Sequence, residues 1–158
     1  MRPQLKRDPL GSPAHSQMTS PFHLGVDAQA VEVALKDYLA HPDEGAGELL
    51  RFAQLHHVLP LWTDWVGCIA LRPTGQLVFF AWDDPEKLEP VGAAGDDHRR
   101  MVHAARAEGS RRFPAISGLA PARDASARVC SSCGGSGKLA SVPENVVCEC
   151  GGLGWVPW

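Results

Sequence analysis

The chain has 158 residues, of which 44% are hydrophobic and 21% are charged, and this composition suits one globular domain with a small appendage. A formal net charge of −3 at pH 7 argues against a general cationic attraction to nucleic acid or to anionic lipid. No apolar run approaches the roughly 20 residues that a helix needs to cross a bilayer, so we expect no membrane partner.

Residues 1–25 are predicted to be a disordered lead-in. They contain four prolines and polar filler, and no apolar stretch follows the basic residues Arg2, Lys6 and Arg7. A secretory signal requires such a stretch, so we expect a cytoplasmic protein. In a reducing compartment, paired cysteines indicate a metal site more often than a disulfide.

Two helices are expected next. Asp27 is the predicted N-cap of the first, and apolar residues recur after it with helical spacing until His41-Pro42, where the proline ends the helix. The second helix is expected to run from Gly47 to Val58, with an apolar stripe along one face.

The period of the pattern then changes to that of strands. Residues 67–72 and 76–82 are β-type runs, and Pro73-Thr74-Gly75 between them provides turn chemistry, so they predict a hairpin. Because two strands alone are marginally stable, a third is expected around residues 88–91. Residues 83–86 read as a solvated turn.

A third helix and a boundary complete this region. Asp96 or Asp97 is the expected cap of the helix and Gly109 its stop. The small and polar residues after it have linker composition. The predicted class is α+β, with helices packed on a small antiparallel sheet; the predicted division is a domain over residues 26–116, a linker over 117–127 and a four-cysteine zinc-binding element over 128–158.

The C-terminal segment carries its cysteines in two doublets, Cys130-x-x-Cys133 and Cys148-x-Cys150, each followed by Gly-Gly-x-Gly. Fourteen residues separate the doublets, close to the spacing of zinc ribbons, and Pro143-Glu144-Asn145 marks a turn between them. The segment is too short to bury a core of its own, so something must stabilise it. We predict that the four cysteines bind one structural zinc ion; the alternative is a set of reduced or disulfide-linked thiols.

The same segment resembles the cysteine-rich zinc region of DnaJ-type chaperones, whose repeats read Cys-x-x-Cys-x-Gly-x-Gly. One repeat is matched completely and the end of a second is matched with its first cysteine displaced by one residue: the matching residues are Cys130, Cys133, Gly135 and Gly137, then Cys150, Gly152 and Gly154, with Cys148 displaced. The likeness covers about 26 residues and implies a zinc site.

Three tryptophans are candidate partner-binding residues. Trp62 and Trp65 flank Asp64 in a non-periodic joint between the second helix and the hairpin, and Trp82 lies at the far end of the hairpin. A partly exposed tryptophan often anchors a protein partner. Packing at a domain seam is the alternative for each of them.

Residues 26–110, with two helices, LPLW, the hairpin GCIALRPTGQLVFFAW and a further helix, resemble the SUKH superfamily of small α+β proteins. The resemblance implies a non-enzymatic binder whose partner is another protein, because many members are immunity proteins that neutralise bacterial toxins. It provides no catalytic residues, and the cysteine-rich segment is not part of the shared pattern.

Three functions are compatible with the sequence. A protein-binding module, immunity-like or regulatory and braced by zinc, is favoured because no complete catalytic constellation is present. A nucleic-acid-binding zinc ribbon requires basic residues near the cysteines, but residues 130–158 hold Lys138 against Glu144 and Glu149. A thiol redox or chaperone-like protein would use Cys130 and Cys133, and would need a low thiol pKa and poor metal retention.

Overall fold

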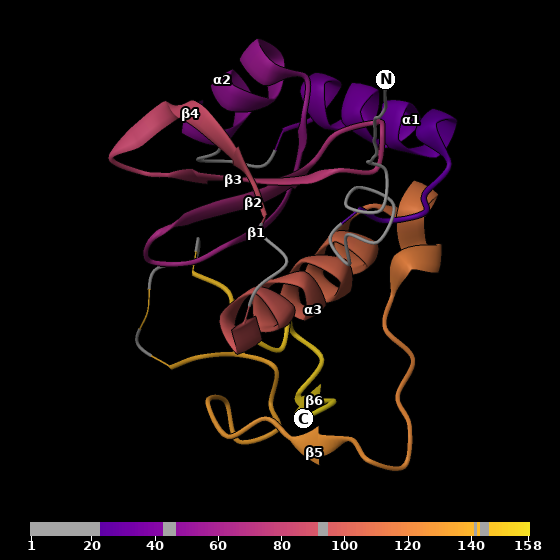
Figure 1. Ribbon diagram of the computed structural model, residues 1–158, viewed down its shortest axis with the longest axis vertical. Coiled ribbons are helices and arrows are strands. Elements are labelled where there is room, and N and C mark those ends of the chain that lie inside the picture. Colours follow the sequence, from indigo (N-terminus) through magenta and orange to yellow (C-terminus); the bar gives the residue numbers. More distant parts are fainter. Residues whose placement is uncertain (1–22, 43–46, 92–94, 141, 143–145) are drawn as a thin grey trace, which may run out of the picture.

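The computed structural model of the chain describes residues 23–42, 47–91, 95–140, 142 and 146–158 (Figure 1). Most of the predicted lead-in, residues 1–22, and the predicted turn at Pro143-Glu144-Asn145 lie outside this part of the chain. We call residues 23–119 the body and residues 128–158 the tail.

The described residues form helices on both sides of an antiparallel sheet, which confirms the predicted α+β class. The helices are α1 (Ala28–Ala40), α2 (Gly47–His56), α3 (Gly95–Arg112) and the 3₁₀ helix η2 (Pro114–Leu119). The strands of the body are β1 (Leu59–Thr63), β2 (Gly67–Leu71), β3 (Leu77–Ala81) and β4 (Asp84–Pro90), and those of the tail are β5 (Arg128–Val129) and β6 (Trp155–Val156).

The sheet of the body has the order β1-β2-β3-β4. The predicted hairpin is its centre, with β2 and β3 paired from Gly67 opposite Ala81 to Leu71 opposite Leu77. Figure 1 shows α1 and α2 above the sheet and α3 below it, with the tail beneath α3. The apolar core therefore lies between the helices and the sheet. None of the helices in the described part of the chain has the length and apolar character of a membrane-crossing segment.

The joint predicted at LPLWT is in fact strand β1, and all five of its residues are buried. Strand β1 contacts α1 and α2 as well as α3, so both of its faces are covered. A strand that is buried on both faces shows no alternation of polar and apolar residues. The sequence of β1 therefore lacked the alternation by which a strand is recognised. Pro60 is tolerated because β1 is an edge strand of the sheet.

The predicted boundaries of the third strand and of the third helix are partly wrong. Strand β4 begins at Asp84, so of the solvated turn predicted at residues 83–86 only Asp83 lies in a turn. Helix α3 begins at Gly95, before the predicted cap, and continues through Gly109 to Arg112. A side chain at Gly109 would bring a Cβ to 2.6 Å from Cδ2 of Leu61 in β1. This glycine is explained by close packing of helix on strand.

Both ends of α1 lie where the sequence predicts them. The Asp27 carboxylate accepts a hydrogen bond from the backbone N–H of Gln29 at 3.0 Å, as an N-cap does, and His41 follows the last helical residue. After α3, η2 buries Ile116 against the body and includes residues 117–119 of the predicted linker.

Candidate metal centre

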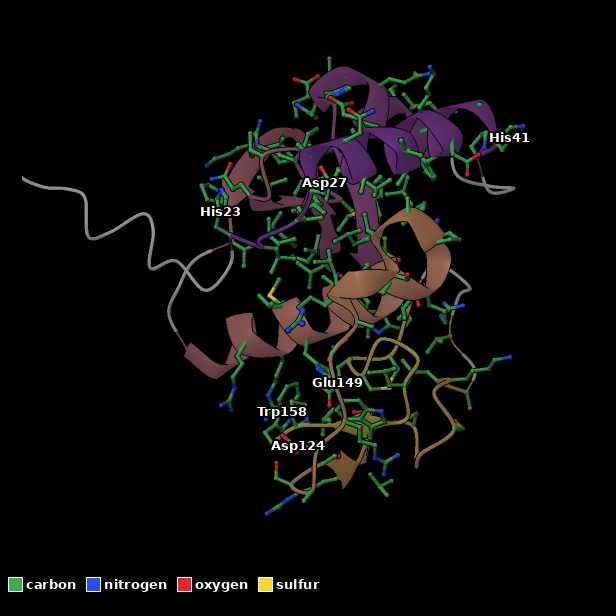
Figure 2. The ribbon with its side chains drawn as sticks, turned by 90° about the vertical axis from the view of Figure 1, so that its right-hand side faces the viewer. His23, Asp27, His41, Asp124, Glu149 and Trp158 are labelled. Atoms are coloured by element: carbon green, nitrogen blue, oxygen red, sulfur yellow. The ribbon has the colours of Figure 1, made fainter. Side chains whose placement is uncertain are left out.

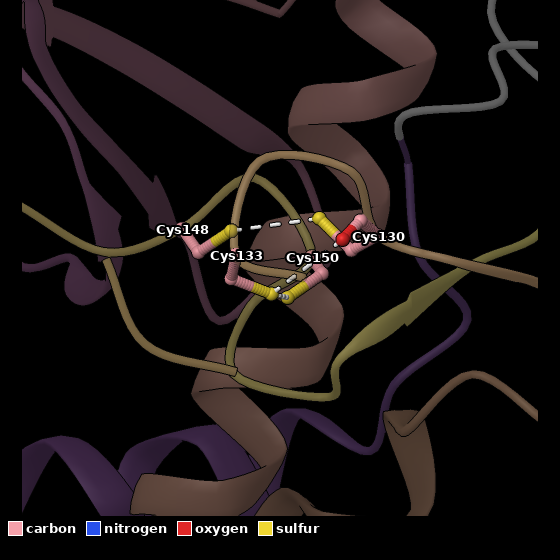
Figure 3. Close-up of side chains that lie close together, drawn as sticks. All are labelled: Cys130, Cys133, Cys148 and Cys150. Carbon is pink, nitrogen blue, oxygen red and sulfur yellow. Dashed lines mark hydrogen bonds between the residues drawn. The ribbon is translucent and has the colours of Figure 1, made fainter. Parts of the chain in front are cut away.

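The tail is closed by its two short strands. Arg128 pairs with Val156 and Val129 with Trp155, and the Cys130 N–H donates to the carbonyl oxygen of Gly154 at 3.0 Å. These contacts bring the start and the end of the tail together, so both cysteine doublets reach one point, as Figure 3 shows.

The four cysteine sulfurs converge there. Their Sγ atoms all lie within 4.8 Å of one another, with 3.6 Å between Cys130 and Cys148 and 3.8 Å between Cys133 and Cys150. Four sulfurs placed tetrahedrally at about 2.3 Å from a zinc ion would be about 3.8 Å apart. The donor set and its spacing therefore fit a tetrahedral thiolate site, and this group could hold a metal ion.

The two doublets differ in length but their loops are equivalent. The N–H of Gly137 donates to Sγ of Cys133 at 3.2 Å, and the N–H of Gly154 donates to Sγ of Cys150 at the same distance. Both bonds run from the last glycine of Cys-Gly-Gly-x-Gly back to its cysteine. Backbone N–H groups that point at sulfur stabilise the thiolate form that a metal requires.

The loops also pack on each other reciprocally. A Cβ at Gly137 would lie 2.4 Å from the carbonyl oxygen of Gly152, and a Cβ at Gly154 would lie 2.4 Å from that of Gly135. Gly137 and Gly154 have φ of 81° and 84°, which other residues adopt only with strain. The repeated glycines are therefore needed for the approach of the two loops that holds the sulfurs together.

Burial and hydrogen bonding act in opposite directions on the thiols. Partial burial raises the pKa of Cys133, but hydrogen bonds from the backbone of Gly137 and Gly135 outweigh it and lower this pKa to about 7. Burial raises the pKa of Cys148 and also that of Cys150. A bound divalent cation would offset this cost, since it stabilises four thiolates in one small volume.

The tail is attached to the body next to the cysteines. The Val147 N–H donates to the carbonyl oxygen of Thr63 at 3.0 Å, and Nε1 of Trp62 donates to that of Cys148 at 3.2 Å. Both bonds lie at the edge of the body sheet, where β1 has no other neighbouring strand in the described part of the chain. One of the four clustered cysteines is therefore held directly by the body.

A second contact joins the tail to α3. A Cβ at Gly151 would lie 2.6 Å from the carbonyl oxygen of Ala104 and from Cβ of Ala107, so the second cysteine loop touches the helix backbone. Arg100 and Glu149 form an ion pair at 3.7 Å. The sequence did not point to this interface, because its residues are far apart along the chain.

The three candidate tryptophans occupy different environments. Trp62 is 6% exposed and binds the tail as described above. Trp82 is half-buried against Phe80, and its Nε1 donates to the carbonyl oxygen of Asp64 at 2.9 Å. Trp65 is 64% exposed in the turn between β1 and β2. Of these three, only Trp65 therefore presents most of its ring on the surface.

The fifth cysteine is separate from the cluster. Cys68 lies in β2 with no exposed surface and packs with Phe52 and Phe80. Burial raises the pKa of its thiol far above the ordinary value. It behaves as a small apolar side chain.

No protein-family model, no curated protein and no solved structure matches the chain significantly. The likenesses to the SUKH superfamily and to the DnaJ-type zinc region therefore stay predictions from the sequence. The α+β fold and the cluster of four cysteines are what the structure establishes.

Proposed function

We propose that Cys130, Cys133, Cys148 and Cys150 hold one Zn²⁺ as a structural ion. The observation that carries this proposal is the convergence of four sulfurs within 4.8 Å, each doublet with its own glycine N–H donor. Four thiolates leave no coordination position for water, so the ion would stabilise the tail and would not activate a substrate. The likeness to half of a DnaJ-type zinc region supports the same ion.

The direct test is the metal content of protein purified without oxygen and without added metal. We expect one zinc per chain by elemental mass spectrometry. Protein that contains no metal and does not take up zinc when it is added would contradict the proposal, and so would disulfides formed under these conditions.

We propose further that the protein is a non-enzymatic binding module, immunity-like or regulatory, that recognises another protein such as a toxin. The support is the SUKH-like order of elements and the exposed pair Trp65 and Val66, which are 64% and 61% exposed in the β1–β2 turn. Exposed tryptophan beside an aliphatic residue is a common anchor for a protein partner.

The binding proposal is tested by affinity capture from native lysate with matched variants. We expect one stoichiometric protein partner that Trp65→Ser loses and Leu55→Ser keeps. Leu55 is an exposed apolar residue on α2, 61% exposed, and serves as the control for a change of surface polarity. Equal capture by both variants would show that Trp65 is not the anchor.

A thiol redox or chaperone-like function is the second candidate, because the pKa of Cys133 is lowered to about 7. The two sulfur pairs within hydrogen-bonding distance cross between the doublets, Cys130 with Cys148 and Cys133 with Cys150. A redox protein would therefore form cross-doublet disulfides and retain zinc poorly. Mapping of disulfides by mass spectrometry after mild oxidation, with and without zinc, separates this function from a structural metal site.

A further inference from the structure

An apolar cavity of about 500 Å³ lies between the β1–β2 turn, α3 and the tail. The apolar side chains that line it come from segments distant in the chain: Trp62, Trp65 and Val66 of β1 and its turn, Phe79 of β3, Met101 of α3 and Val147 of the tail. Trp62 is buried and Phe79 and Met101 are half-buried, whereas Trp65 and Val66 are exposed. The cavity therefore combines a covered apolar base with an exposed apolar rim.

A second, smaller cavity adjoins the first on the other side of Phe79. It has a volume of about 220 Å³ and is lined by residues of β3, β4 and the turn between them, with Phe79 among them. The Phe79 ring also reaches towards the β1–β2 turn, since a Cβ at Gly67 would lie 2.9 Å from its Cε1. The Trp82 N–H donates to the carbonyl oxygen of Val66 at 3.0 Å and joins the two turns. We call the two cavities together the Trp65 groove.

The charge of the Trp65 groove is negative. Its described lining includes five acidic and two basic residues: Asp64, Asp83, Asp84, Glu89 and Glu149, with Lys87 and Arg100. Lys87 pairs with Glu89 at 3.3 Å, and Arg100 pairs with Glu149 at 3.7 Å. Figure 2 shows Glu149 in the tail, just below α3. Both basic groups are therefore already neutralised, and the carboxylates that remain favour a cationic ligand.

The remaining carboxylates lie in the turns next to the exposed tryptophan. Oδ1 of Asp64 accepts hydrogen bonds from the N–H groups of Val66 and Gly67 at 2.9 and 3.0 Å, which holds the turn that presents Trp65. Asp83 and Asp84 are exposed in and directly after the β3–β4 turn. None of these three carboxylates forms an ion pair within the described part of the chain. The same end of the sheet therefore presents an apolar anchor point and negative charge.

We propose that the Trp65 groove binds a basic segment of the partner protein, in which a large apolar side chain is flanked by lysine or arginine. The apolar side chain packs against Trp65, Phe79 and Met101, and the flanking cations face Asp83 and Asp84. Because the anchor point and these carboxylates lie in adjoining cavities, a ligand that uses both is a chain of several residues. This inference rests on the proposed binding function and adds the chemistry of the partner. The same charge disfavours a nucleic acid, whose phosphates it would repel.

The first experiment is selection from a random peptide library displayed on phage, with the full chain immobilised. We expect the enriched peptides to carry a net positive charge and at least one aromatic or large aliphatic residue. Enrichment of acidic or neutral peptides, or no enrichment at all, would overturn this inference. Neither result would contradict the proposed binding function, because capture from lysate with Trp65→Ser tests that function without a peptide.

The second experiment locates the binding with variants of the protein. The probe is the most enriched peptide, synthesised with a fluorescent label and measured by anisotropy. Trp65→Ser is expected to weaken its binding roughly thirtyfold or more, as loss of an anchor does. Asp83→Asn with Asp84→Asn is expected to weaken it roughly threefold to tenfold at low salt, and less at high salt because exposed charges are screened.

The matched control is Glu32→Gln with Asp37→Asn. This pair changes the net charge by the same amount, but both residues are exposed on α1, on the other side of the sheet (Figure 1). We expect peptide binding to remain within about twofold of the wild type. An equal loss of affinity in the two double variants would show a general effect of net charge and would contradict the groove.

The third experiment changes the peptide. One version has glutamate in place of every lysine and arginine, and another has serine in place of the apolar anchor. We expect both to lose most of the binding. Equal binding of the charge-reversed peptide would overturn the role of the carboxylates and leave Trp65 as an anchor. A basic peptide that binds Trp65→Ser as tightly as the wild type would contradict both this inference and the anchor role of Trp65.

Discussion

The body and the tail of this protein bury their interiors with different chemistry. The body closes over a core of aliphatic and aromatic side chains between α1, α2, α3 and the sheet. The buried cluster of the tail consists of Cys130, Cys148, Cys150 and Val156, with Cys133 packed against it. Apolar burial scales with the area removed from water, which a segment this short cannot supply. The buried interior of the tail is therefore made largely of cysteine sulfur, whereas that of the body is made of apolar side chains.

The two regions are nevertheless joined. Strand β1 and helix α3 belong to the body core, and both contact the tail directly, through Trp62 and Thr63 on β1 and through Ala104 and Ala107 on α3. A substitution in this interface is therefore expected to affect both the body and the tail. Variants that affect the core, the metal ligands or the interface alone separate these contributions.

The largest effect is expected from removing two of the proposed metal ligands. Cys130→Ser with Cys148→Ser leaves a single thiol in each doublet, and zinc that binds with about 10–16 kcal/mol would no longer hold the tail. We expect zinc content to fall to near zero and the tail to be cleaved in limited proteolysis while the body resists. Cys68→Ala is the control, because Cys68 lies in the body core and its loss should leave the zinc content unchanged. A protease-resistant tail in the double variant would show that the metal does not organise it.

The second largest effect is expected from a substitution that leaves a cavity in the core of the body. Phe52 is 1% exposed and packs on Phe80 with ring centres 4.5 Å apart, so Phe52→Ala is expected to lower the free energy of unfolding by about 3–5 kcal/mol. Chemical denaturation followed by tryptophan fluorescence measures the loss, and zinc content should remain at one per chain. Leu55→Ala on the same helix is exposed and should change the stability by less than about 0.5 kcal/mol. Loss of zinc from Phe52→Ala would mean that the two regions cannot be separated.

The interface is tested by two equivalent glycines. Gly134 and Gly151 follow the last cysteine of each doublet and have φ of 65° and 66°, but a Cβ at Gly134 meets nothing within 4 Å. Gly134→Ala therefore costs only backbone strain of about 1 kcal/mol. Gly151→Ala adds a clash with α3 and is expected to cost about 1–3 kcal/mol more. Hydrogen exchange of tail amides measures the difference, and equal effects would show that the tail does not press on α3.

A smaller effect is expected from the bond between Trp62 and the tail. Trp62→Phe keeps an aromatic ring but removes the Nε1 donor to the Cys148 carbonyl oxygen. We expect a loss of about 0.5–1.5 kcal/mol, seen as faster hydrogen exchange near Cys148. Trp82→Phe is the control, because the Nε1 of Trp82 donates to Asp64 within the body. Faster exchange near Cys148 in both variants would contradict a specific role for Trp62.

The smallest effect is a pH dependence from His103. Burial lowers the pKa of His103 below its ordinary 6.5; Arg106 acts in the same direction and the hydrogen bond to the backbone of Trp155 opposes them. As pH falls, the unfolded chain therefore takes up this proton before the folded chain does. The stability that His103 contributes is complete above pH 6.5 and is lost as pH falls through the lowered folded pKa.

The measurement is the denaturation midpoint of the wild type and His103→Phe at pH of about 7.5 and about 5.5. Acid also protonates the cysteines, so the informative quantity is the difference between the two proteins. We expect the variant to lose less stability on acidification than the wild type. A variant that is equally sensitive to acid would show that His103 does not titrate in this range.

Local patterns were sufficient for many of the elements. Helix α1 has its cap at Asp27, and the β2–β3 hairpin has turn residues between two apolar runs, so both could be recognised from neighbouring residues. Strand β1 could not, because burial on both faces removes the alternation that marks a strand. Gly109 was misread as a helix stop because the residue that requires it, Leu61, lies in a distant strand.

The sequence by itself determined the candidate metal donors of this protein. Two cysteine doublets and a repeated Gly-Gly-x-Gly specify four sulfurs and their N–H donors within one short segment, because ligand spacing and backbone conformation are local properties. Only the tertiary structure decided where that segment docks, which tryptophan stays exposed and which arginines surround Trp155 and Trp158. The physical reason is that each of these contacts joins residues far apart in the chain, as Trp62 and Cys148 are by 86 positions, and forms only when the whole core has packed.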